Sequence, residues 1–451
     1  MNTMANNSWD VIVLGGGVSG CMAAIASARQ GSRTLLVEQY GFLGGALTNA
    51  GVGPMMTFHA GSRQVVTGIP QELVDRMCEL GGCIGHIEDS TGYASSVTPF
   101  DAEIMKLALD QLTAESGVTV LFHARIVSVN CTNDTLTSVC VQTRGGLLTL
   151  EGKVFVDATG DAALSAAAGA DVRQGRDLDG FCQPMTTNMK VRCVDIEALK
   201  AEVRREPENF NIKDLSAMDR APRLSVAGFY RQFNAAKQRG ELSTAREDIL
   251  LFETVVPGEV IVNSTRVVLL NPTDAWDFSE AERLGRQQSH ELMRFFRNDC
   301  AGFEKAELIS TGVQIGVRES RRVMGDYLLT AEDLLSSRHF DDTVALGGYP
   351  IDIHNPTGEK TETTHLKPGQ FYYIPLRSLI VRGKENLLVC GRCISATHEA
   401  GAAIRVTPIA MGVGQAAGAA AGLAAKRGLA VRALEFAQVR SALEQLGATL
   451  Q

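Results

Sequence analysis

The stretch WDVIVLGGGVSG, residues 9–20, joins a short β-branched apolar run to a cluster of glycines. The next residues, CMAAIASARQ at 21–30, predict a helix of small residues that ends at Gly31. The apolar run TLLVE at 34–38 then predicts a second strand. A strand, a glycine turn, a helix and a strand within about thirty residues predict a βαβ unit with parallel strands.

The glycines of this turn have the spacing Gly15-x-Gly17-x-x-Gly20. Gly15 permits the tight turn, Gly17 lets a pyrophosphate approach the backbone, and Gly20 allows the helix and strand to pack closely. Val18 and Ser19 open the helix, whose free N–H groups and positive dipole end attract phosphates. In this context the spacing predicts a dinucleotide site rather than a glycine turn without a ligand.

A second glycine cluster begins three residues after Glu38, the acid that ends the second predicted strand. An acid in this place binds the ribose hydroxyls of an adenosine, and Gln39 stands beside it. The cluster ends in Gly44-Gly45-Ala46, where a nicotinamide-binding domain would continue into a helix. A loop along the cofactor and an ordinary surface loop are both compatible with this cluster.

The middle of the chain has a different character from its two ends. A helix is predicted over 101–116, and short antiparallel strands then form a β-meander up to Asp157. From about 185 to 375, helices alternate with strands and longer loops. The helices are predicted at 195–206, 225–239, 279–299 and 316–335.

The C-terminal part returns to a buried strand and a glycine turn, in ENLLVCGRCIS at 385–395. Thr407 as a hydroxyl cap and Pro408 as the first helical residue predict the start of a long helix. Arg427 and Gly428 provide an equally good end.

Composition limits the location and the partners of the protein. The net charge is −8 without a basic run, which argues against a nucleic-acid partner. Ten scattered cysteines, a polar N-terminus without a signal-peptide pattern and a weakly hydrophobic 409–425 stretch predict a cytoplasmic protein that no membrane anchors. A homo-oligomer is compatible with the sequence.

Several motifs resemble one known family. These are GFLGG at 41–45, ATGD at 158–161, RESRRVMGDYLLTAEDL at 318–334, FYYIPLRSL at 371–379 and GRCISATHEAGAAIRVTPIAMGVGQAAGAAAG at 391–422. Over nearly its whole length the chain is similar to bacterial FAD-dependent oxidoreductases of the two-dinucleotide-binding flavoprotein superfamily. These enzymes are distant relatives of the fumarate reductase and succinate dehydrogenase flavoproteins.

The resemblance implies that FAD is the cofactor and that it binds in an extended form, with adenosine at Glu38. The double glycine at 44–45 would then pass along the pyrophosphate toward the flavin. Further contacts with FAD are implied at Arg125, Ile126, Ala158, Thr159, Gly160, Asp161, Gly391, Arg392, Thr407 and Pro408.

We therefore predict an α/β fold, with a Rossmann-like FAD-binding domain that holds a parallel sheet and a β-meander. An α+β substrate domain is inserted into it. The FAD-binding domain is predicted over 1–60, 101–185 and 380–451, and the substrate domain over 61–100 and 186–379.

The catalytic candidates are His398, Arg405 and His59. His398 can move the proton that accompanies hydride transfer, or it can satisfy backbone groups in a loop. Arg405 can bind a substrate anion with both arms of its guanidinium, or pair with a flavin carbonyl or Glu399. The resemblance implies these two residues as the nearest match to the His and Arg that hold a carboxylate in fumarate reductase, at a different spacing. His59 is a further candidate base.

Other charged and reactive residues are predicted to lie outside the chemistry. Arg318, Arg321 and Arg322 with Glu319 are interpreted as a charged helix face. His354 and His365 lie in a loop-rich stretch that could cap the active site, and an exposed loop is the favoured interpretation. Cys390 and Cys393 have redox spacing, but the first of them lies in a buried predicted strand. The His and Cys spacings match no zinc site, so no metal is predicted.

The predicted reaction is hydride transfer between flavin N5 and a small organic substrate, with an unidentified electron acceptor or donor. The pair Gly391-Arg392 stands where flavin monooxygenases usually have Gly-Asp, which favours a dehydrogenase or reductase. Flavin monooxygenation and a non-catalytic FAD-binding or RNA-modifying scaffold are the alternatives. A pyridine-nucleotide disulfide reductase is disfavoured because the middle of the chain has no second nucleotide fingerprint.

Overall fold

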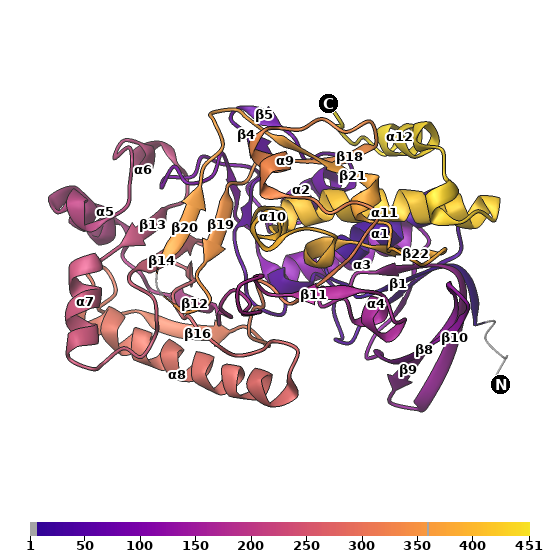
Figure 1. Cartoon of the computed structure of the whole chain (residues 1–451). Coiled ribbons are helices and arrows are strands. Elements are labelled where there is room, and N and C mark those ends of the chain that lie inside the picture. Colours follow the sequence, from indigo (N-terminus) through magenta and orange to yellow (C-terminus); the bar gives the residue numbers. More distant parts are fainter. Residues whose placement is uncertain (1–6, 359) are drawn as a thin grey trace.

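The computed structural model describes residues 7–358 and 360–451. The first six residues of the polar N-terminus and of the predicted FAD-binding domain therefore lie outside the described part. Figure 1 shows a larger body that contains both the first strands and the last helices of the chain. A smaller body, made from the middle of the chain, carries the helices α5, α7 and α8 at the other end of the molecule.

A seven-stranded mixed sheet forms the centre of the larger body. Its parallel strands lie in the order β7 (Thr119–Leu121), β2 (Thr34–Val37), β1 (Ser8–Leu14), β10 (Gly146–Asp157) and β22 (Leu387–Val389). The meander adds two antiparallel strands, β9 (Thr135–Thr143) and β8 (Arg125–Thr132). This arrangement confirms the predicted α/β Rossmann-like fold with its β-meander.

The long strand β10 serves both parts of this sheet. Residues 146–151 pair with β9 in antiparallel fashion, and residues 155–157 pair with β22 in parallel. Asn386, just before β22, donates to the carbonyl oxygens of Leu136 and Lys153 and accepts from the Leu136 N–H. The end of the chain is thus part of the sheet that the beginning of the chain starts.

Helices α1 (Val18–Arg29) and α11 (Thr407–Arg427) cross at very short range, and Figure 1 shows them next to each other. A Cβ on Gly414 would overlap the Ser19 carbonyl, and a Cβ on Gly418 would overlap the Ala23 carbonyl. Helix α11 is long and apolar enough to cross a membrane, but 89% of its most apolar window is buried inside the molecule. Its glycines and alanines therefore serve close packing within the fold.

The ends of α11 confirm one prediction and correct another. Gly428 ends the helix in the left-handed region, with φ 65° and ψ 34°. The N-cap is Val406, not Thr407, and no side chain caps this end. Thr407 is already the first helical residue, so its hydroxyl cannot reach the N–H groups that a cap satisfies.

The smaller body contains an antiparallel sheet with its own hydrophobic core. The strand order is β13 (Ser225–Gly228), β14 (Ile249–Glu253), β15 (Val260–Val262), β12 (Met189–Arg192) and β16 (Glu307–Thr311). Its helices are α5 (Ile196–Arg205), α6 (Ala217–Arg220), α7 (Tyr230–Gln238) and α8 (Ala275–Asp299). The predicted helix at 225–239 therefore begins only at Tyr230, after a strand.

The helix predicted over 316–335 is wrong. The segment forms the short strand β17 (Arg321–Val323), paired with β11 (Val172–Gln174), and the short helix α9 (Ala331–Leu335). Gly325 packs so closely on Ser395 that a Cβ would lie 2.9 Å from the serine Cβ, and Thr330 caps α9 in a capping box. Two of the residues interpreted as a charged helix face, Glu319 and Arg322, instead form a buried ion pair.

The remaining elements complete the larger body and its border. Its core includes Ile69 and Leu73 of α2 and Ile374 of β21, although both segments were assigned to the substrate domain. The domain boundaries stay a prediction.

The remaining helices are α2 (Ile69–Glu79), α3 (Ala102–Glu115, capped by Asp101), α4 (Ala163–Ala167), α10 (His398–Ile404) and α12 (Phe436–Gln445). The short strand pairs are β3 (Met55–Met56) with β6 (Val97–Thr98), β4 (His59–Ala60) with β5 (Arg63–Gln64), β18 (Thr343–Gly347) with β21 (Tyr372–Pro375), and β19 (Ile351–His354) with β20 (Thr361–Thr364).

Candidate functional site

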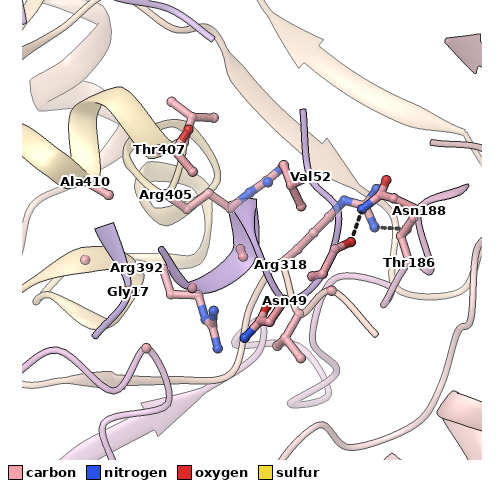
Figure 2. Close-up of a pocket in the computed structure, with 18 of the residues that line it drawn as sticks. Gly17, Asn49, Val52, Thr186, Asn188, Arg318, Arg392, Arg405, Thr407 and Ala410 are labelled. Carbon is pink, nitrogen blue, oxygen red and sulfur yellow. Dashed lines mark hydrogen bonds between the residues drawn. The ribbon is translucent and has the colours of Figure 1, made fainter. Parts of the chain in front are cut away.

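One cavity of about 870 Å³ lies between the glycine turns of the larger body and the sheet of the smaller one. Figure 2 shows Gly17 and Arg392 at one side of it, Thr186 and Asn188 at the other, and Arg318 between them. The predicted site residues that line the cavity are Gly15, Gly17, Val18, Ser19, Glu38, Gln39, Gly45, Ala46, Arg125, Ile126, Ala158, Thr159, Gly160, Asp161, Gly391, Arg392, Arg405 and Thr407. The predicted residues outside this lining are Gly20, Gly44, His59, His398 and Pro408.

The three glycines of the first turn differ in their surroundings. A Cβ on Gly15 would overlap the Ala158 carbonyl, and one on Gly20 would overlap the Gly15 carbonyl. A Cβ on Gly17 would meet no atom closer than the Cα of Gly45 at 3.8 Å, and Gly17 has an ordinary φ of −63°. Gly15 and Gly20 are therefore required by packing, whereas the bare backbone at Gly17 faces open cavity.

Glu38 lies at the cavity wall and also braces the turn. Its Oε2 accepts from the Gly16 N–H at 2.6 Å, and its Oε1 accepts from the Tyr40 N–H at 2.8 Å. Burial raises the pKa of this carboxyl above its ordinary value, although the two backbone hydrogen bonds oppose the rise. The sequence did not predict this bracing role, and the ribose role of Glu38 stays a prediction.

The ATGD segment is held by two different carboxylates. Asp157 is fully buried and accepts four hydrogen bonds, from the N–H and hydroxyl groups of Thr159 and Ser165. Asp161 pairs with Arg392 at 2.5 Å and accepts from the Ser320 hydroxyl at 2.7 Å. The Nε of Arg392 is buried without a hydrogen-bond partner among the described residues, so a polar group of a ligand can satisfy it.

The two ends of the chain meet at the cavity, as the sequence predicted. The Ser19 hydroxyl donates to the Ala410 carbonyl at 2.7 Å. A Cβ on Gly391 would lie 3.5 Å from the Ser19 Cβ. The starts of α1 and α11 therefore border the same space.

The far half of the cavity is lined by titratable residues that were not among the predicted site residues: Arg246, Glu247, Asp248, Arg266, Arg318, Asp352, His354 and Lys360. Burial lowers the pKa of Arg318 well below its ordinary value, and the positive charges of Arg405, Arg266 and Arg246 lower it further. Arg318 lies in no helix and lines the cavity, so its interpretation as part of a charged helix face is wrong. Its guanidinium donates to the Pro184 carbonyl, the Thr186 hydroxyl and the Asn263 amide oxygen.

His354 is buried on β19, which corrects its placement in an exposed loop. Burial and the charge of Arg318 lower its pKa to about 3, so the ring is neutral near pH 7. Arg266 lies 3.0 Å from Nδ1 and can only donate, so Nδ1 accepts and Nε2 carries the proton. Nε2 then donates to Asp352 at 3.2 Å. Burial opposes the ionisation of Asp352, but this bond and the charge of Arg405 hold its pKa below the ordinary range.

His398 does not face the cavity, contrary to the prediction. It is buried, and its Nδ1 lies 2.9 Å from Glu319, which also pairs with Arg322. Arg322 in turn donates to the Ala396 carbonyl at 3.0 Å. His398 begins α10 and ties this helix to β17, so its position indicates a structural rather than a catalytic role.

The remaining candidates also lie away from the cavity. His59 contacts the Ser96 hydroxyl at 3.0 Å, and burial lowers its pKa. His365 is exposed and packs its ring against Tyr93. Burial raises the pKa of the Cys390 thiol to about 12 and raises that of Cys393 well above its ordinary value, which disfavours a catalytic dithiol.

A family model described as FAD dependent oxidoreductase matches residues 10–443. The chain belongs to this family. FAD is therefore the cofactor of this oxidoreductase. The cavity fits such a group, because it combines the bare backbone of Gly17, the start of α1 and the unpartnered Nε of Arg392.

Solved structures of several other proteins resemble this oxidoreductase at low sequence identity. The flavin-dependent brominase Bmp2 is 13% identical, over 97% of this chain and 83% of its own, with a TM-score of 0.48. The p-nitrophenol 4-monooxygenase PnpA from Pseudomonas putida DLL-E4 is 9% identical, over 97% and 86%, with a TM-score of 0.49. A geranylgeranyl bacteriochlorophyll reductase-like protein from Thermoplasma acidophilum is 13% identical, over 97% and 83%, with a TM-score of 0.44.

Proposed function

We propose that this oxidoreductase is a dehydrogenase or reductase that transfers a hydride between FAD and a small organic substrate. When bound, FAD supplies the hydride chemistry. One observation carries the proposal: a single cavity joins the glycine turn at Gly17 to a polar chamber at Arg318 and Asp352. A cofactor and a substrate can therefore lie in one continuous space.

The residues of the chain have separate tasks in this proposal. The residues around Gly17 and Arg392 bind and orient FAD, as the family resemblance implies. Val406, Thr407 and Ala410 at the start of α11 line the cavity, and the positive end of the helix stabilises negative charge that develops there. The resemblance to fumarate reductase flavoproteins, the cytoplasmic location and the absence of nucleic-acid and membrane partners remain predictions.

Flavin monooxygenation is the competing function. The residue after Gly391 is an arginine whose charge is engaged by Asp161. This ion pair supports the proposal, because it places a cation where flavin monooxygenases usually have an aspartate. The scaffold alternative would require that the chamber takes no substrate.

Anaerobic reduction distinguishes these functions. The purified protein is expected to carry FAD, visible in its absorbance and identified after release by heat. Under anaerobic conditions an organic substrate should bleach the oxidised flavin, or an organic acceptor should restore the colour of the reduced one. Absence of FAD would contradict the whole proposal. Incorporation of an oxygen atom from labelled O₂ into the product would support the monooxygenase instead.

A further inference from the structure

Four arginines line the far half of the cavity, and they outnumber its three carboxylates, Glu247, Asp248 and Asp352. Arg246 is paired with Asp248 at 3.0 Å. Among the described residues, no carboxylate lies within 4.0 Å of the guanidinium of Arg266 or Arg318. Asp352 is the partner of Arg405, at 3.3 Å, and it also accepts from His354.

The hydrogen bonds of these arginines leave room for an anion. Arg318 and Arg266 donate only to neutral acceptors in the described part of the chain, such as Asn263 and Thr361. The Nε of Arg405 is buried without a partner there. Figure 2 shows the Arg405 side chain extending from the start of α11 into the cavity. Like charges held together in a partly buried space repel one another, and an anion bound among them removes this cost.

The walls of the same chamber are apolar and aromatic. Met56, Leu250 and Phe252 line it together with Tyr93 and Tyr349, whose rings pack edge to face at 5.9 Å. Such walls bury a carbon skeleton, while the arginines fix one charged end of it. The combination is typical of a site for an organic anion.

We propose that Arg318 and Arg405 bind an anionic oxygen group of the substrate, a carboxylate or a phosphate, in this chamber. The inference rests on the proposed function, because it places the substrate in the same cavity as FAD. The planar guanidinium forks of these residues match the paired oxygens of either group. The arginines thus determine the substrate class and hold the apolar part of the substrate against Tyr93 and Tyr349.

Binding to the FAD-loaded protein tests this inference without any turnover. Calorimetry compares three probes of similar shape: phenylacetate, phenyl phosphate and the neutral phenylacetamide. At least one of the two anions is expected to bind about tenfold or more tightly than the amide. The preferred anion tells carboxylate from phosphate. Equal affinity for all three probes, or no binding of either anion, would overturn the inference.

Two variants assign the effect to the named residues. Arg405→Met and Arg318→Met are each expected to weaken binding of the preferred anion by about tenfold or more, with little change for the amide. Arg144→Met, on the exposed turn between β9 and β10, is the matched control and should bind as the original protein does. If Arg318→Met does not fold, Arg405→Met alone decides, and unchanged anion binding in that variant contradicts the inference.

The outcomes separate this inference from the proposed function. Anion binding that depends on Arg405, in a protein whose flavin no substrate reduces, would contradict only the proposed hydride transfer. A flavin that an uncharged substrate reduces, together with equal binding of acid and amide, would contradict only the anion chamber.

Discussion

At the scale of single residues, the three glycines of the first turn separate packing from ligand access. Gly15 and Gly20 have no room for a methyl group, because carbonyl oxygens occupy the place of their Cβ atoms. Gly17 has an ordinary backbone conformation and enough space for a methyl group. The lack of a side chain there leaves this space open to the cavity. The same residue type is therefore needed for different physical reasons within six positions.

Substitution at these glycines should have opposite effects on stability and on FAD content. Gly17→Val is expected to fold with an unchanged Tm in the absence of FAD and to lose the cofactor, because the valine occupies the space of the pyrophosphate. Gly20→Ala should lower the free energy of unfolding by about 1–3 kcal/mol, since it overpacks the turn. The ratio of flavin to protein absorbance and the Tm measure the two effects. A Gly17→Val protein that retains FAD would contradict the predicted path of the cofactor.

His354 should make the stability depend on pH. Its pKa of about 3 in the folded protein lies below the value near 6.5 of an unfolded chain, so protons favour the unfolded state between these values. The free energy of unfolding should therefore fall as the pH decreases from about 6.5 toward 3. Urea denaturation at pH 7.5 and at pH 5.0 measures this loss of free energy of unfolding. The loss should be about 2 kcal/mol smaller in His354→Gln than in the original protein. His290→Gln, on the exposed side of α8, is the control and should follow the original protein.

The sequence predicted the glycine turns but not the chamber, for a physical reason. Gly17, Glu38 and Arg392 stand in motifs whose local spacing reflects one extended ligand. Arg318 and His354 belong to distant segments that only tertiary packing brings together. One local signal existed: Arg266 stands between two short apolar runs, residues 260–262 and 267–270, and a buried charge in such a place indicates a functional role.

At the scale of elements, the crossing of α1 and α11 shows how small residues set a distance between helices. Gly414 and Gly418 are four residues apart and thus lie on one face of α11, against the backbone of α1. Because these glycines have no side chain, the backbone of α11 can approach the backbone of α1 directly. This approach brings the starts of both helices to the same cavity.

Alanine substitutions on α11 should distinguish the crossing from helix propensity. Gly418→Ala adds a methyl group where the Ala23 carbonyl lies, and should lower the free energy of unfolding by about 1–3 kcal/mol. Gly412→Ala has its nearest neighbour at 3.7 Å and should be neutral, or stabilising by up to about 1 kcal/mol. Chemical denaturation measures both. Equal losses in the two variants would contradict the importance of the close crossing.

Helices whose apolar residues follow a helical period could be predicted from the sequence. Segments whose conformation depends on contacts with residues far away in the sequence could not. The helix predicted over 279–299 has apolar residues at helical spacing, and α8 contains it. The segment 316–335 carries charges that were interpreted as one face of a helix, but Glu319 pairs with Arg322 and His398 in the interior. Periodicity does not reveal such a pairing, because the partner lies 79 residues away in the sequence.

At the scale of the whole molecule, the first and last parts of the chain share one core. Buried residues of β1, such as Ile12, belong to the same cluster as Leu388 of β22 and Val413 of α11. The smaller body is attached between them and has a core of its own. The cavity and the residues predicted to bind FAD therefore come together only when both ends of the chain are present.

Division of the chain should therefore abolish folding of the larger body. A fragment ending at Gly383, in the exposed turn before β22, is expected to be insoluble or to lack cooperative unfolding and FAD. Co-expression with the fragment 384–451 should restore a soluble complex that contains FAD. Size-exclusion chromatography with absorbance at flavin wavelengths measures this result. A soluble 1–383 fragment that binds FAD would contradict the shared core.

The double pairing of β10 has a consequence for protein synthesis. Its parallel edge at 155–157 can be completed only by 387–389, roughly 230 residues later in the chain. At a translation rate of about 5–20 residues per second, a ribosome needs about 10–45 s to make that interval. Throughout this time the nascent chain exposes an open strand edge, so we expect its yield in the cell to depend on chaperones that shield this edge.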